Sequence, residues 1–205
     1  MTLRLNGSSS GFTEIDAPAA AGSNTLTLPT SNGSANQFLK NGSTAGALEF
    51  AALGVLDEVD QWYLNGNAGS DGVVTSLARN NHEGAAQIGT GMTQSSGVFT
   101  FPSTGKWLVV CNASFGIDGS DSVTLSISVT LDGGSSFNDV AFASDGNNGS
   151  GSRNGSGTTC HFLDVTSTSN VKVRFVAGSL GGSSEVQGET GDMRTNFLFI
   201  RLGGT

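Results

Sequence analysis

The sequence contains few charged residues. Asp, Glu, Lys and Arg make up 13% of its 205 residues, about half the share in typical soluble domains. Nine Lys and Arg stand against seventeen Asp and Glu, and no basic cluster occurs. Nucleic-acid affinity rests on basic side chains that neutralise phosphates, so the composition argues against a nucleic-acid partner. The scattered acidic residues, with a net charge of −8, indicate solubility.

Cysteine and histidine are also scarce. Cys111 and Cys160 are the only cysteines, and each lies in a strand-like run. Two buried free thiols are the interpretation we favour, and a disulfide between neighbouring strands is the alternative. His161 adjoins Cys160, but no paired ligand spacing appears, so we expect no metal site and no cofactor. His82 and His161 belong to no catalytic motif, and we expect no enzymatic activity.

Long apolar runs are missing as well. No run is long enough to cross a membrane, and residues 1–6 lack the apolar core of an export signal. We therefore expect synthesis in the cytoplasm without a cleaved signal peptide, and no membrane insertion.

Glycine is abundant, with 31 residues against only 3 prolines, and Ser, Thr and Asn are common. Frequent turn residues and few charges indicate many short strands and an all-β fold. The hydrophobic share of 36% and the clear period-2 runs argue against disorder.

Residues 89–115 form the most informative stretch. A β-branched and aromatic run at 98–101 precedes turn residues at 102–105, which predicts a strand, a tight turn and a second strand. In the run 106–115 the odd positions from Trp107 to Phe115 share one face, and the even positions share the other. The first half is apolar on both faces, so we expect this strand to be covered on both sides.

Other runs define further strands and loops. Residues 195–202 are also apolar on both faces. Residues 123–131 alternate strictly, which predicts a core face and a wet face in an outer sheet. Residues 145–158 contain no apolar side chain, and 178–192 are rich in glycine, so both are predicted to be exposed loops.

The order G-x-F-x-F-P-x-x-G-x-W resembles the hairpin of tumour-necrosis-factor and complement-globular-head jelly rolls. The positions that carry it are Gly97, Phe99, Phe101, Pro102, Gly105 and Trp107. The resemblance implies a jelly-roll β-sandwich of about eight strands over residues 56–205, and a homotrimer whose inner sheet faces the threefold axis. The inner-sheet and interface candidates are Phe99, Phe101, Trp107, Leu108, Val110, Phe197, Leu198, Phe199 and Ile200.

Residues 1–55 differ from the rest of the chain, because their short strands are too few to enclose a core. Residues 10–50 resemble a module of bacteriophage tail-fibre and spike proteins, in which three chains intertwine. The matching positions are Leu26, Leu28, Pro29, Gly33, Gln37, Leu39, Gly46, Leu48 and Phe50. The module occurs once, whereas long fibres repeat it, so a long shaft is not expected. Residues 89–107 and 199–203 further resemble jelly-roll domains of marine bacteriophage virion proteins.

These resemblances imply a trimeric structural protein on the virion surface, a short tail fibre or spike whose first segment attaches to other virion proteins. A capsid-decorating or head-fibre trimer is the alternative. A stand-alone carbohydrate-binding module is a third class. It would need an exposed stacking aromatic, for which Trp62, Tyr63 and Trp107 are the candidates.

The loop 145–158 supplies the candidates for a receptor contact: Asn147, Asn148, Arg153 and Asn154. Their ligand would be a host-surface glycan, and the alternative is that the loop only solvates the particle. Asp118, Asp121 and Asp145 would be the ligands of a calcium ion, but we favour turn residues that hydrogen-bond the local backbone.

Overall fold

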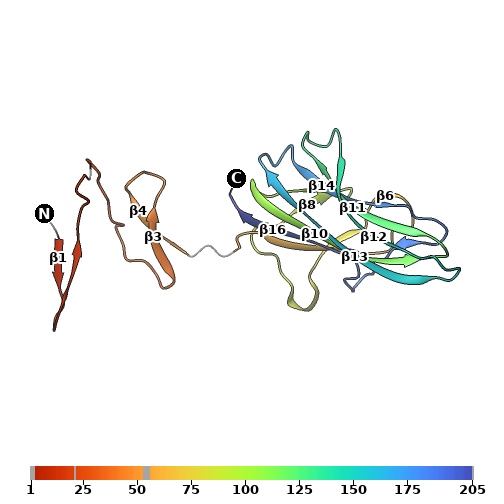
Figure 1. Cartoon of the computed structure of the whole chain (residues 1–205), viewed down its shortest axis with the longest axis horizontal. Helices are drawn as coiled ribbons and strands as arrows, with labels where there is room; N and C mark the ends of the chain where they lie inside the picture. Colours follow the sequence, from red (N-terminus) through yellow and green to blue (C-terminus); the bar gives the residue numbers. More distant parts are fainter. Residues whose placement is uncertain (1–2, 21, 53–55, 205) are drawn as a thin grey trace. The chain divides into compact units, whose positions relative to one another are not determined.

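The computed structural model describes residues 3–20, 22–52 and 56–204. These residues form strands and one short 3₁₀ turn, η1 (His82–Gly84), with no α-helix among them (Figure 1). No helix in these ranges is long and apolar enough to cross a membrane. The chain divides into two compact units, Met1–Val55 and Leu56–Thr205, and each is described by itself. The predicted all-β class is confirmed.

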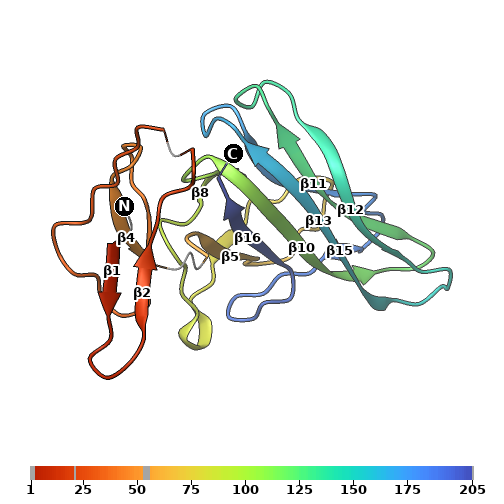
Figure 2. The same ribbon diagram turned by 60° about the vertical axis from the view of Figure 1, so that its left-hand side comes forward.

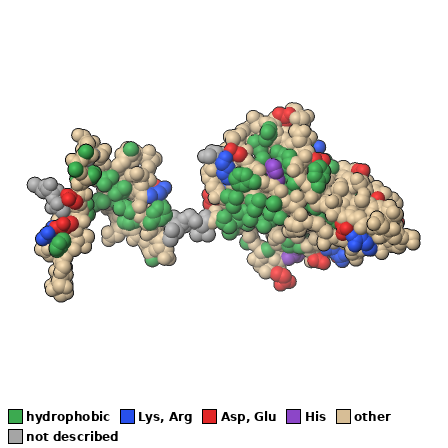
Figure 3. Space-filling model, in the orientation of Figure 1, with side chains coloured by type: hydrophobic (Ala, Val, Ile, Leu, Met, Phe, Trp, Pro, Cys, Tyr) green, Lys and Arg blue, Asp and Glu red, His purple; other side chains and the backbone are tan. Residues whose placement is uncertain are grey.

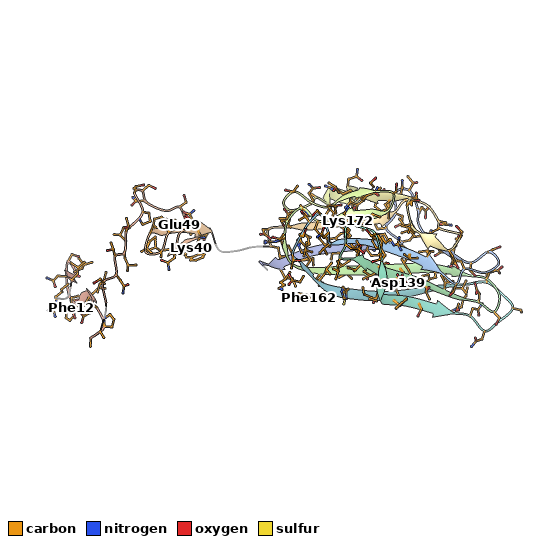
Figure 4. All side chains as sticks on the ribbon, turned by 90° about the horizontal axis from the view of Figure 1, so that it is seen from above. Phe12, Lys40, Glu49, Asp139, Phe162 and Lys172 are labelled. Carbon is orange, nitrogen blue, oxygen red and sulfur yellow. The ribbon has the colours of Figure 1, made fainter. Side chains whose placement is uncertain are left out.

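The N-terminal unit holds two small antiparallel sheets, in which β1 pairs with β2 and β3 pairs with β4. The strands are β1 (Leu3–Asn6), β2 (Phe12–Ile15), β3 (Gln37–Asn41) and β4 (Leu48–Ala52). Lys40 and Glu49, labelled in Figure 4, face each other across the second sheet, with Nζ and Oε1 3.0 Å apart. An exposed ion pair of this kind contributes little to stability.

None of the described residues of this unit is buried. Leu26 and Leu28 are 68% and 70% exposed. The strand predicted over residues 24–29 forms a single bridge, between Thr27 and Ala47. Residues 24–28 are all exposed, so no alternation of burial is seen, and among the described residues no partner strand runs beside them. The expectation that this unit cannot enclose a core alone is confirmed, and the predicted boundary near residue 55 lies outside the described residues.

The C-terminal unit is a sandwich of two six-stranded sheets, seen from a second side in Figure 2. The sheet built around β10 has the order β13–β10–β16–β5–β7, with β15 also on β10. Its strands are β5 (Val59–Leu64), β7 (Leu77–Arg79), β10 (Gly105–Ile117), β13 (Arg153–Val165), β15 (Glu185–Val186) and β16 (Asn196–Gly203). We call it the β10 sheet.

The opposing β11 sheet has the order β12–β11–β14–β9–β8, with β6 also on β14. Its strands are β6 (Gly72–Val73), β8 (Thr93–Ser95), β9 (Val98–Thr100), β11 (Ser122–Thr130), β12 (Asn138–Gly146) and β14 (Lys172–Gly178). The short strands of both sheets, such as β6 and β15, come in addition to the roughly eight predicted. The predicted β-sandwich is confirmed.

The predicted hairpin around residues 102–105 is corrected. β9 pairs with β8 and β14, whereas β10 pairs with β13 and β16, so the turn carries the chain from one sheet to the other. The true hairpin joins β8 to β9 through Ser96 and Gly97, with φ of 51° and 82°. Positive φ at both turn positions matches the twist of paired strands. Phe99 and Trp107 therefore lie on opposing sheets, and both are buried in the core between them.

Alternation along β10 is confirmed. Trp107, Val109, Cys111, Ala113 and Phe115 are buried, and the even-numbered side chains point away from the core. Aromatic side chains from both sheets meet between the layers. Among them, the Phe175 and Phe197 rings stack with centroids 3.9 Å apart, and the Phe99 and Phe199 centroids are 4.9 Å apart.

The wet face predicted for residues 123–131 is not found. The strand ends at Thr130, and Leu131 is 67% exposed in the following turn. Ser126 and Ser128, on the face predicted to be wet, are 2% and 0% exposed. Arg174, opposite Ser128 on β14, lies over the Phe137 ring, 3.9 Å from its centroid. Larger neighbours of this kind shield the small hydroxyl side chains from solvent. The residue pattern of a single strand does not reveal these neighbours.

Both long predicted loops are shorter than expected. β12 continues to Gly146 and β13 begins at Arg153, so only residues 147–152 form a loop. Residues 153–158 lack apolar side chains but pair with β10, because cross-strand partners override weak local strand preference. The segment 178–192 contains β15, and Val186 is fully buried.

Replacing Phe199 with Ala should lower the free energy of unfolding by about 3–5 kcal/mol, because the cavity opens among the three aromatic rings of Phe99, Phe101 and Phe175. Urea denaturation followed by fluorescence measures it. The matched control is Leu131→Ala, which should change stability by less than about 0.5 kcal/mol. Equal effects of the two substitutions would contradict the described core.

A peptide of residues 1–55 should not order alone, because none of its described residues is buried. At low micromolar concentration, its amide hydrogens should exchange at rates close to those of an unfolded chain. The full-length protein provides the comparison, since cover from other chains would protect the same amides. Dispersed, protected amide signals from the monomeric peptide would contradict this expectation.

Candidate functional site: the outward face of the β10 sheet

The face of the β10 sheet that points away from the core carries two cross-strand apolar rows. In one row Leu108 lies between Phe162 on β13 and Ile200 on β16. In the next, Val110 lies opposite Leu198. We call these five side chains, Leu108, Val110, Phe162, Leu198 and Ile200, the apolar face.

The apolar face lies at the surface of the described chain. Phe162, labelled in Figure 4, is 56% exposed, and the other four side chains are half-buried. Figure 3 shows hydrophobic side chains gathered on this unit toward the end where the C-terminus lies. A contiguous apolar surface of this kind marks a contact with another chain more often than a solvated surface.

A chain of neutral hydrogen bonds crosses the same face beside the apolar rows. The Thr158 hydroxyl donates to Asn112 Oδ1 at 3.0 Å, and the Asn112 amide donates to Asn196 Oδ1 at 3.0 Å. Gln61 also donates to Asn196 Oδ1, at 3.4 Å, and accepts from Asn80 at 2.9 Å. We call this chain the amide ladder. It holds no charge, so another chain can cover it without desolvating an ion.

Charged groups border the apolar face at the opposite side. Lys106 forms an ion pair with Asp164 across β10 and β13. Arg201 donates from Nε to the Thr104 carbonyl at 2.9 Å and pairs with Asp57. The face is therefore an apolar centre between an ionic border and the uncharged amide ladder.

The structure divides the predicted interface candidates into two groups. Phe99, Phe101, Trp107, Phe197 and Phe199 are at most 2% exposed and fill the sandwich core, so they are not surface residues. Leu108, Val110, Leu198 and Ile200 lie together on the outward face. The correction follows from strand alternation, because odd-numbered side chains of β10 and β16 point inward and even-numbered ones outward.

Sequence reasoning missed Phe162 and the amide ladder. Phe162 is on β13, whose register against β10 could not be read from one strand. The signal for Asn112 was present, since it follows Leu108 and Val110 at even spacing on the same predicted strand.

The two cysteines are free and lie on opposite faces. Cys111 is buried in the core, and Cys160 is exposed beside Val110. Burial raises the pKa of the Cys111 thiol, which keeps it protonated. The expected pair of buried thiols is thus corrected for Cys160, and the alternative disulfide is not present.

The three aspartates considered for calcium are occupied locally. Asp118 Oδ1 accepts from the Ser152 hydroxyl at 2.8 Å, and Asp145 pairs with Arg153. A hydrogen bond from Ser184, then backbone bonds from Gly181 and Ser122, hold the pKa of Asp121 below its usual value. Over the described residues, no group of three His, Cys, Asp or Glu side chains could hold a metal ion.

The predicted receptor residues separate in the structure. Asn147 and Asn148 lie in the 147–152 loop, where the Asn147 amide donates to the Gly151 carbonyl and Oδ1 accepts from Gly149 N at 3.0 Å. Arg153 and Asn154 instead begin β13. The aromatics considered for sugar stacking, Trp62, Tyr63 and Trp107, are at most 9% exposed and offer no open ring face.

Comparison with solved structures shows the fold. The chain is similar to Eiger TNF from S. frugiperda, with a TM-score of 0.53 and 13% identity over 72% of this chain and 93% of that chain. It is also similar to murine APRIL at pH 5.0, with a TM-score of 0.50 and 11% identity over 71% and 98%. No protein-family model and no curated protein sequence matches the chain. A TNF-like jelly roll is therefore shown, and at these identities the likeness concerns the fold alone.

Proposed function

We propose that the protein is a trimeric structural component of a bacteriophage virion, a short tail fibre or spike that displays the jelly-roll unit. The observation that carries the trimer is the apolar face. Leu108, Val110, Leu198 and Ile200 are half-buried without contact to the core, on a sheet whose other face already fills it. Covering such a surface gains about 25 cal/mol per Å² of apolar area.

In the proposal, each chain meets its neighbours through two different surfaces, which favours a closed ring. Besides the apolar face, Val140 and Phe142 on edge strand β12 are 39% and 57% exposed. β12 packs beside β13, and Val140 and Phe142, at alternate positions of β12, give it an apolar edge. A contact between the apolar edge of one copy and the apolar face of the next copy is heterologous. Three such contacts close a threefold ring.

The N-terminal unit supports the same assembly. Its exposed apolar side chains require cover from other chains, because none of its described residues is buried. They are Leu3, Leu5, Phe12, Ile15, Leu26, Leu28, Phe38, Leu39 and Phe50. In the proposal, three copies intertwine over residues 1–55, or this unit docks on another virion protein. The virion assignment rests on the resemblance of residues 10–50 to phage fibre modules.

The jelly-roll unit has a defined polarity. Its first strand enters at Val59, which pairs with Ile200, near the start of β10. β10 runs 13 residues, about 40 Å, to Ile117, where the 118–121 and 147–152 loops lie. The loops are therefore remote from the N-terminal connection, which suits display toward the host. Loops on a rigid β-scaffold commonly carry recognition.

The purified full-length chain should have about three times its 20.7 kDa mass by light scattering. Leu198→Asp should dissociate the trimer, because it places a charge in the middle of the apolar face without touching the core. Thr93→Asp, on an exposed strand position of the β11 sheet, is the matched control and should remain trimeric. A folded monomer for the unsubstituted chain would refute the trimer.

Gold labelling of a tagged chain in purified particles should place it on the tail. This expectation rests on the resemblance of residues 10–50 to tail-fibre and spike modules. Label on the head surface would instead support the capsid-decoration alternative. A chain that is absent from washed, infectious particles would contradict a virion role altogether.

A further inference from the structure

Beyond the amide ladder, the outward face of the β10 sheet ends in a polar groove of about 400 Å³. It lies at the Ile117 end of β10, among side chains from three separate parts of the chain. Its principal lining side chains are those of Asp118, Arg153, Asn154, Glu185 and Gln187. Its volume falls within the range of small-molecule sites.

The groove exists because one cross-strand row has a glycine at its centre. Gly116 on β10 lies between Asn154 on β13 and Glu185 on β15. A Cβ at Gly116 would come within 3.1 Å of Gln187 Nε2 and 3.2 Å of Glu185 Cγ. The missing side chain therefore leaves a notch with polar side chains on both walls.

Hydrogen bonds hold part of this wall in place. The Gln187 amide donates to Asn154 Oδ1 at 3.1 Å and accepts from the Ser114 hydroxyl at 2.9 Å. The side-chain carboxylate of Glu185, in contrast, has no hydrogen bond or ion pair among the described residues. A held amide beside an unengaged carboxylate offers fixed acceptors and donors to hydroxyl groups.

A second polar depression, of about 580 Å³, adjoins the first and shares Glu185 and Gln187 with it. It is lined further by Asn67, Glu189 and Arg194. The last two pair with each other, with Nη2 and Oε2 2.8 Å apart, so the charge left in this lining is that of the shared Glu185. Two depressions that share a wall fit an extended ligand better than a single small ring.

We propose that this double groove binds a neutral oligosaccharide. Planar amides and carboxylates suit pairs of sugar hydroxyls, and the connected depressions suit more than one sugar ring. In the first depression Arg153 is engaged by Asp145, while Asp118 and Glu185 leave excess negative charge that disfavours sialic and uronic acids. The inference rests on the proposed virion appendage for its biological meaning, although the groove itself lies within one chain.

The groove contains no aromatic side chain, so a single site binds weakly. Three copies on one trimer would raise the apparent affinity by multivalency. An array of immobilised oligosaccharides is therefore the appropriate assay, since it presents many ligands to each particle. It requires only the full-length protein.

The array carries neutral gluco-, galacto-, manno- and rhamno-oligosaccharides from mono- to tetrasaccharides, with matched sialylated and uronic-acid chains. Labelled protein should bind at least one neutral series, more strongly as the chain lengthens. Gln187→Ala should weaken this binding by about tenfold or more. Gly116→Ala fills the notch without positive-φ strain and should weaken it as well.

Asn170→Ala is the matched control, because this exposed asparagine lies in the turn between β13 and β14 and lines neither depression. It should leave binding unchanged. No binding of the unsubstituted chain to any neutral series, a preference for anionic chains, or loss caused by Asn170→Ala alone would each overturn the assignment. Light scattering of every variant reports trimer formation separately, so a failed trimer and a failed groove are distinguishable.

Discussion

The constraint on which the structure depends is that the central strands of the β10 sheet are apolar on both faces. Side chains alternate along β10 and β16, so Trp107 and Phe199 fill the sandwich while Leu108 and Ile200 point outward. The β11 sheet can cover only one of these faces. The other remains at the surface of a single chain, and its apolar area is the driving force that we assign to assembly.

The rest of the outward face fits that role. The amide ladder, centred on Asn196, satisfies its own hydrogen bonds within one chain. Another chain can cover it without removing a charge from water. Covering the ion pairs of Lys106 and Arg201 at the border would instead desolvate charged groups. Farther along the same face, Gly116 interrupts the row of side chains and opens the groove. Along the length of β10, the outward face of the sheet thus carries first the apolar side chains, then the uncharged amide ladder and finally the groove.

The sequence allowed the fold class and the two faces of individual strands to be predicted. Alternation placed Val109 and Phe197 on the faces opposite to Val110 and Leu198, because that period depends only on local geometry. Which of the two apolar faces is buried was not predicted and is shown by the structure. Sheet membership could not be predicted the same way. Phe99 lies in the sheet opposite Trp107, since a turn of the same residues can reverse a strand or cross between layers.

Long-range pairing also explains what was missed at the candidate sites. Residues 153–158 read as a loop, yet they form a strand because β10 supplies hydrogen-bond partners along their length. The groove joins Gly116, Asn154 and Glu185, which are far apart in sequence and meet only through strand register. No local pattern identifies such a site. In contrast, the sequence of β10 alone shows that both faces of this strand are apolar.

A cryo-electron microscopy or crystal structure of the purified full-length chain tests the central claim most directly. The account predicts threefold symmetry, with Leu108, Val110, Leu198 and Ile200 of each copy buried against the neighbouring copies. An oligomer in which these four side chains face solvent, or a monomer that leaves them uncovered, would contradict it.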